Sequence, residues 1–166
     1  YTINVSGDEN QGNYTVNYEA GTFTITKADY DMSGVVFENK TVNYNGEEHS
    51  IVAENLPEGV TATYDGNAQV NAGEYTVTAH FTGDANHNEI ADKTALLTIN
   101  KKAITVKADD NSKVYGTIEP TLVATVDGLV GEDTVKYTVS REEGENVGTY
   151  TINVSGDENQ GNYTVN

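Results

Sequence analysis

A long internal repeat constrains this chain more than any other feature of its sequence. The segment YTINVSGDENQGNYTVN occupies residues 1–17 and recurs without change as residues 150–166. Because Tyr1 and Tyr150 open the two copies, the repeat period is 149 residues. A weaker half-period lies inside it, since Tyr75 stands 75 residues before Tyr150 in a similar context. We therefore predict modules of about 75 residues in two alternating types.

The composition favours strands over helices. Thr occurs 22 times, Val 19 times and Tyr 11 times, whereas Leu occurs only five times and the amphipathic Leu stripes typical of helices are absent. Residues branched at Cβ and aromatic residues suit the pleated, half-buried surface of a sheet. The sequence therefore predicts an all-β chain.

Short alternating segments predict a small Greek-key β-sandwich in each module. In the first type, the expected strands are GVVFE (34–38), KTVNYN (40–45), HSIVAEN (49–55), VTATYD (60–65), GEYTVTAHFT (73–82) and KTALLTIN (93–100). The turn signals between them are Asn45-Gly46, Pro57-Glu58-Gly59, Asp65-Gly66 and Gly83-Asp84. Tyr75 and Tyr150 each stand near the start of a late strand, in GEYTV and GTYTI, and are predicted to form structural tyrosine corners.

The two copies of the repeat continue differently, and this sets the expected domain boundaries. Asn17 is followed by YEAGTFTITK (18–27), which is predicted as the last strand of a second-type module, whereas the second copy ends at Asn166. We expect residues 1–27 to be the C-terminal strands of a preceding module and residues 28–102 to be a complete sandwich. Residues 103–166 are then a sandwich without its last strand.

A sandwich without an edge strand exposes unpaired backbone groups and an apolar slot. We expect a neighbouring copy to supply the strand head to tail, as in donor-strand addition. The expected donor residues are Thr22, Phe23, Thr24, Ile25 and Thr26. The alternative is that the chain is a piece of a longer continuous filament.

The linkers between modules predict a semi-rigid rod. TKAD (26–29) and NKKAI (100–104) contain neither Gly nor Pro, so strand is expected to run almost directly into strand. The formal net charge of −17 argues against nucleic acid and anionic membranes as partners, because phosphate contacts need Lys and Arg. It also keeps long molecules soluble and apart.

The sequence offers no convincing chemistry. There is no Cys, so disulfides and thiolate catalysis are excluded, and no nucleophile elbow or phosphate loop is present. His80 and His87 do not have a recognised metal spacing. Asp84 with Asn86, and Asp157 with Asn159, are expected to form Asx-stabilised turns rather than calcium loops. We expect neither catalysis, nor a cofactor, nor a metal, nor insertion into a membrane.

Several motifs resemble a known family. YGTIEPTLVATVDGLVGEDTV (115–135) with REEGENVGTYTINVSGDENQGNY (141–163) resembles the YGX type of MBG domain, an immunoglobulin-like module of bacterial surface proteins. YDMSGVVFENKTVNYNGEEHSI (30–51) resembles the repeat that often alternates with it in surface adhesins. The resemblance implies an extracellular location on the bacterial cell surface and no catalytic residues, and for some such proteins an association with mucin.

Two functions remain open from the sequence. The first is a structural repeat of an adhesin stalk, which spaces an adhesive tip from the cell wall. The second is binding of mucin-type glycans or host surface proteins by the modules themselves, with avidity raised by repetition. The first residues to suspect for glycan stacking are Tyr14, Tyr18, Tyr30, Tyr44 and Tyr64.

Overall fold

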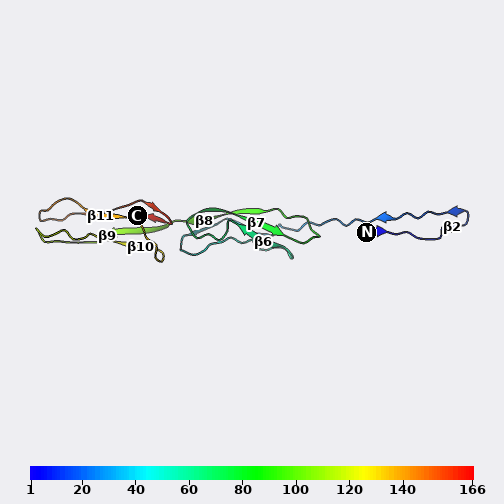
Figure 1. The fold of residues 1–166 in the computed structure, drawn as a ribbon, viewed down its shortest axis with the longest axis horizontal. Helices are drawn as coiled ribbons and strands as arrows, with labels where there is room; N and C mark the ends of the chain where they lie inside the picture. Colours follow the sequence, from blue (N-terminus) through cyan, green and yellow to red (C-terminus); the bar gives the residue numbers. More distant parts are fainter.

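A computed structural model describes residues 1–166 and contains fourteen strands and no helix (Figure 1). The all-β prediction is confirmed. No helix is therefore long and apolar enough to cross a membrane. Three segments follow one another along the long axis of the molecule in Figure 1, and we name them the N-terminal hairpin (residues 1–27), the central segment (28–100) and the C-terminal segment (101–166).

The N-terminal hairpin extends away from the other two segments (blue in Figure 1). Its strands are β1 (Thr2–Ile3), β2 (Asn10–Gln11), β3 (Tyr14–Thr15) and β4 (Gly21–Thr22). β1 pairs with β4 and β2 pairs with β3, both antiparallel. Almost all of its side chains are exposed, so the hairpin has no core of its own.

The central segment is built on one four-stranded sheet in the order β5-β8-β7-β6. Its strands are β5 (Lys40–Asn43), β6 (Thr61–Asp65), β7 (Gly73–Thr82) and β8 (Lys93–Asn100). β5 lies parallel to β8, and the other pairs are antiparallel. Along β7, Val77, Ala79 and Phe81 are buried in alternation, as the period of two in a half-buried strand requires.

The prediction of strands at 34–38 and 49–55 is wrong, because these stretches make only the isolated bridges Val36–Glu54 and His49–Gln69. Side chains there make the hydrogen bonds to the backbone that a neighbouring strand would otherwise make. The Asn67 side chain accepts the Ile51 N–H at 2.9 Å and donates to the Ile51 carbonyl at 2.7 Å. The Tyr64 hydroxyl accepts the Ala53 N–H at 2.8 Å. One residue of each stretch is buried, Val35 in the first and Ile51 in the second, but burial does not determine which group pairs with the backbone.

The C-terminal segment contains two sheets. Its strands are β9 (Lys102–Ala108), β10 (Ala124–Asp127), β11 (Thr138–Arg141), β12 (Ile152–Ser155), β13 (Asn159–Gln160) and β14 (Tyr163–Val165). The first sheet has the order β10-β9-β14-β13, with β14 parallel to β9, and the second is the pair β11-β12. Only Lys101 separates β8 from β9, so the chain passes from one segment to the next without a loop.

The main core crosses from the central to the C-terminal segment. It comprises Tyr44, Ile51, Val77, Ala95, Leu97, Ile99, Ile104 and Tyr163. Ile104 and Tyr163 are the only buried residues of the C-terminal segment, and both lie at this junction. A second, smaller cluster of Val35, Val60, Ala79 and Phe81 fills the other end of the central segment.

Candidate functional site

The two predicted corner tyrosines make equivalent bonds. The Tyr75 hydroxyl donates to the Asn71 carbonyl at 3.0 Å, and the Tyr150 hydroxyl donates to the Asn146 carbonyl at 2.8 Å. Each ring therefore fastens the loop that precedes its strand. The Arg141 guanidinium lies 5.3 Å from the centre of the Tyr150 ring, which adds a cation–π contact at the second position.

Beside Tyr150, four charged side chains form a closed ion cluster at the end of the molecule. The Lys113 ammonium lies 2.8 Å from both Glu119 and Glu145. The Arg141 guanidinium lies 2.5 Å from Glu119 and 2.9 Å from Glu145. Hydrogen bonds from Arg141 and Lys113 lower the pKa of Glu119 to about 2. The cluster balances two cations with two carboxylates and ties together loops that are distant in the sequence.

A groove of about 430 Å³ opens next to this ion cluster. Its walls come from residues 111–122 on one side and residues 141–152 on the other. Two exposed apolar side chains, Tyr115 and Val147, are among those that line it. Large exposed apolar residues concentrated around a concave surface mark a place where another chain or ligand binds.

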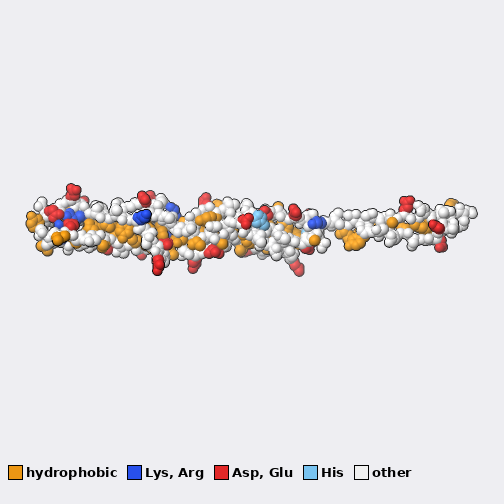
Figure 2. All heavy atoms as spheres, in the orientation of Figure 1, with side chains coloured by type: hydrophobic (Ala, Val, Ile, Leu, Met, Phe, Trp, Pro, Cys, Tyr) orange, Lys and Arg blue, Asp and Glu red, His pale blue; other side chains and the backbone are white.

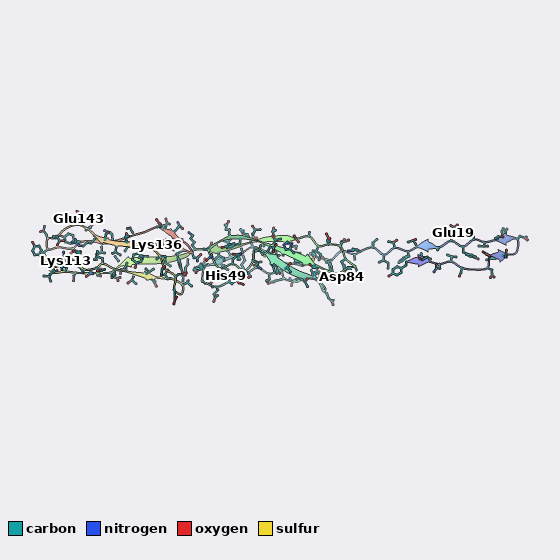
Figure 3. All side chains as sticks on the ribbon, in the orientation of Figure 1. Glu19, His49, Asp84, Lys113, Lys136 and Glu143 are labelled. Carbon is teal, nitrogen blue, oxygen red and sulfur yellow. The ribbon has the colours of Figure 1, made fainter.

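The predicted donor residues lie on the N-terminal hairpin, and the central segment separates them from the groove (Figure 1). Figure 3 shows Lys113 and Glu143 near one end and Glu19 on the hairpin near the other. Residues 22–26 are all exposed, and Phe23 and Ile25 remain 54% and 67% accessible. Two hydrogen bonds of 2.8 and 2.9 Å join Phe23 in this stretch to Tyr1, the residue before β1.

The junction between the two larger segments holds a second constellation, which sequence reasoning missed. The Asp133 carboxylate accepts hydrogen bonds from the Tyr44 hydroxyl at 2.8 Å and from the Tyr163 hydroxyl at 2.6 Å. The two rings meet edge to face, with centroids 5.5 Å apart and planes at 86°. The Tyr163 hydroxyl also accepts the Val130 N–H at 3.0 Å. Tyr44 and Asp133 are 89 residues apart in the sequence, so no local sequence pattern predicts their contact.

Burial and hydrogen bonding shift the pKa values at this junction. Burial, followed by the bond to Asp133, raises the pKa of Tyr163 to about 12. The bond to Asp133 is the largest cause of the raised pKa of Tyr44. The bonds from Tyr163 and Tyr44 lower the pKa of Asp133. All three groups therefore keep the protonation states that these bonds need at neutral pH.

Asn162 adds backbone contacts to the same junction. Its side-chain oxygen accepts the Ala72 N–H at 2.8 Å, and its side-chain nitrogen donates to Asn71 at 3.2 Å. Its carbonyl accepts the Lys102 N–H at 2.9 Å. Asn71 is also the partner of the Tyr75 corner, so the corner and the junction are joined.

The five tyrosines suspected of glycan stacking differ in exposure. Tyr14 is exposed, Tyr44 is buried in the junction, and the other three, Tyr18, Tyr30 and Tyr64, are half-buried. Tyr30 stacks on His87 with ring centroids 4.0 Å apart. These rings therefore do not gather on one open surface.

The residues considered as metal ligands are engaged in local contacts. His80 bonds to Asp92 at 2.8 Å and to Asp65 at 3.1 Å. The Asp84 carboxylate accepts the Asn86 N–H at 2.9 Å, which is an Asx turn, and the same oxygen lies 2.7 Å from His87. For Asp157, it is the backbone carbonyl that is engaged, with the Gln160 side chain at 2.9 Å.

The part of the chain that carries the groove matches a known protein family. Residues 104–166 match the model of the MBG domain (YGX type). No curated protein and no solved structure matches the chain. The match covers β9 to β14 apart from the first two residues of β9, and it includes Asp133, Tyr150 and Tyr163. This match confirms the resemblance of residues 104–166 to the YGX type of MBG domain, whereas the alternating repeat expected from residue 30 onward is not shown.

Proposed function

We propose that this chain is a non-catalytic structural repeat of a bacterial surface adhesin, with immunoglobulin-like modules placed end to end as an extracellular stalk. The MBG domain suggests a repeat of a surface protein. The observation that carries the stalk proposal is the junction, where one hydrophobic core and one hydrogen-bonded carboxylate span two segments.

The junction resists bending for two physical reasons. A hinge motion would separate Ile104 and Tyr163 from Leu97 and Ile99, and would return buried apolar surface to water. It would also strip Asp133 of its two phenol donors, and hydrogen bonds to a charged acceptor are among the stronger ones. The single residue Lys101 between β8 and β9 leaves little slack to absorb the motion.

The surface charge suits a spacer. Acidic side chains are scattered along the whole length in Figure 2, and the net charge is −17. Like charges spread along a chain repel one another and oppose its folding back on itself. Stalks that stand side by side on a surface would repel each other for the same reason.

Binding of mucin-type glycans by the modules is the competing function. It would need aromatic rings open to a sugar face, and of the five tyrosines named above only Tyr14 is exposed, at 76%. The spacer therefore has the better support.

Rigidity of the junction tests the proposal. Because the chain has no Cys, two exposed residues on opposite sides of the junction, Thr63 and Asp127, can be replaced by Cys and spin-labelled. We expect a distance distribution as narrow as that of a control pair within the central segment, Thr63 with Glu74. A distribution several-fold broader than the control would mean a hinge and would contradict the stalk.

A glycan array and immobilised mucin test the competing function with the same unlabelled chain. We expect no saturable binding above that of an unrelated protein of similar acidity. Saturable binding would make the modules receptors, whether or not the junction is rigid.

A further inference from the structure

The turn that follows β5 contains the only Asn-Gly pair of the sequence. Asn45 and Gly46 come two residues after the end of β5, and no other Asn of the chain precedes a Gly. In such a pair the backbone nitrogen of the Gly is well placed to attack the Asn side-chain amide, because glycine has no Cβ to hinder the approach. The product is a succinimide ring, so this turn is a place where the chain can modify itself.

The Asn45 side chain is held at both of its polar atoms. Its Oδ1 accepts the Glu47 N–H at 2.9 Å, which is an Asx turn, and its Nδ2 donates to the Glu47 carboxylate at 2.9 Å. The bond to the Glu47 N–H folds the side chain toward the Gly46 peptide, which lies between the two residues. The carbon that would be attacked is therefore kept near the attacking nitrogen, and such positioning accelerates a reaction.

Two hydrogen-bond donors converge on the oxygen of the same side chain. The His49 Nε2 lies 2.9 Å from the Asn45 Oδ1, and with its proton on this nitrogen it donates beside the Glu47 N–H. His49 is itself fixed, because its N–H and carbonyl bond to Gln69 at 2.8 and 3.0 Å. Attack on the amide carbon turns this oxygen into an oxyanion, and donors already aimed at it stabilise the charge as it develops.

The attacking nitrogen is free to react. Gly46 belongs to no strand, and no backbone carbonyl accepts its N–H. An amide outside a hydrogen-bonded ladder loses its proton to water more readily than one inside it. Asn45 and Gly46 are both exposed, so water also reaches the ring that would form.

We propose that Asn45 deamidates by itself in the folded chain, with the Gly46 nitrogen as the nucleophile and the Glu47 N–H and His49 as donors to the oxyanion. The bond from the Gly46 nitrogen to the Asn45 Cγ forms, the bond from Cγ to Nδ2 breaks, and the Gly46 amide proton leaves with the ammonia. Water then opens the succinimide at either of its two carbonyls. The products are aspartate and isoaspartate, and in isoaspartate the backbone runs through the former side chain.

The product should be felt at the junction between the central and C-terminal segments. His49 lies toward the end of the central segment that meets the C-terminal segment (Figure 3). The residue before Asn45 is Tyr44, whose hydroxyl donates to Asp133 at 2.8 Å. A Cβ added to Gly46 would lie 2.7 Å from Cγ1 of Val130, so the backbone here packs directly on the C-terminal segment. Isoaspartate lengthens that backbone by one carbon and therefore displaces Gly46 from this contact.

Peptide mapping by mass spectrometry tests the reaction on the full chain, stored at neutral pH in water enriched in oxygen-18. We expect Asn45 to exchange its amide for a carboxyl group that carries one heavy oxygen. Conversion should be about tenfold faster than at Asn111, which precedes Ser and whose oxygen accepts only the Ser112 N–H.

A histidine variant tests the role of the fold. His49→Phe removes one of the two oxyanion donors and should slow conversion of Asn45 by about threefold or more. His80→Phe is the matched control, since it makes the same change elsewhere in the central segment, and it should convert like the parent chain. The parent chain unfolded in urea should also convert more slowly, because it has lost both donors. Equal rates in the two variants, or faster conversion in urea, would overturn the proposal.

The spin-labelled pair at positions 63 and 127 tests the effect on the junction. Its distance distribution should broaden as Asn45 converts, and it should stay narrow in Asn45→Ser, which keeps an acceptor for the Glu47 N–H but cannot close the ring. Conversion without broadening would overturn this effect. The inference goes beyond the stalk proposal, because the width before storage tests the stalk and only the change on storage tests deamidation.

Discussion

At the scale of single residues, Tyr163 contributes to stability through its hydroxyl. The side chain is only 3% exposed, and its hydroxyl donates to Asp133 and accepts the Val130 N–H. Tyr163→Phe keeps the ring but leaves that N–H without a partner, which costs about 1–3 kcal/mol. We expect a fall of this size in the free energy of unfolding, measured by urea denaturation.

Tyr14 is the natural control, because it occupies the same place in the identical repeat and is 76% exposed. Tyr14→Phe should change the free energy of unfolding by no more than about 0.5 kcal/mol. Equal effects of the two substitutions would show that the junction does not stabilise the chain. The pair also shows what sequence cannot say, since identical residues in identical sequences differ only in what other segments bring to them.

Glu119 predicts a pH dependence. Its pKa is lowered from 4.5 to about 2, so it contributes stability that is fully present above pH 4.5 and is lost as the pH falls toward 2. Glu119→Gln removes the titrating group. The variant should be less stable at neutral pH and should lose less stability than the parent chain between those two pH values.

Urea midpoints measured across that pH range check this expectation. Glu143→Gln, in an exposed carboxylate of the same region outside the ion cluster, is the control and should follow the parent chain. If the urea midpoints of the parent chain and of Glu119→Gln fall equally as the pH is lowered, the ion cluster does not form in solution.

At the scale of elements, equivalent positions of two strands should respond differently to truncation. Leu97 of β8 is fully buried, and Leu97→Ala should cost about 2–5 kcal/mol through lost burial and the cavity left behind. Phe23 holds the same register opposite Tyr1 but is half exposed. Phe23→Ala should cost less than about 1 kcal/mol, because about half of the side chain is already in water. Urea denaturation at low micromolar concentration compares them, and equal costs would mean that Phe23 is already buried in solution.

Strands were predictable where alternation is long. The segments 73–82 and 93–100 were predicted with the bounds that β7 and β8 have. Alternating apolar residues do not predict strands correctly at 34–38 and 49–55. The pattern indicates which face is buried, and not which group forms hydrogen bonds with the backbone. The donor stretch stays a prediction from the repeat. The junction was not predicted, since Asp133 sits in a stretch that reads as a plain acidic turn.

At the scale of the whole molecule, the exposed area reflects the arrangement of the segments. The chain exposes 12051 Å², whereas a compact monomer of 17.9 kDa would expose about 8,000 Å². Only 12 of 166 residues are buried, so the segments share a core that is small for the length of the chain. The repeat period and the Gly-free linkers pointed to this elongation, although nothing in the sequence gives its extent.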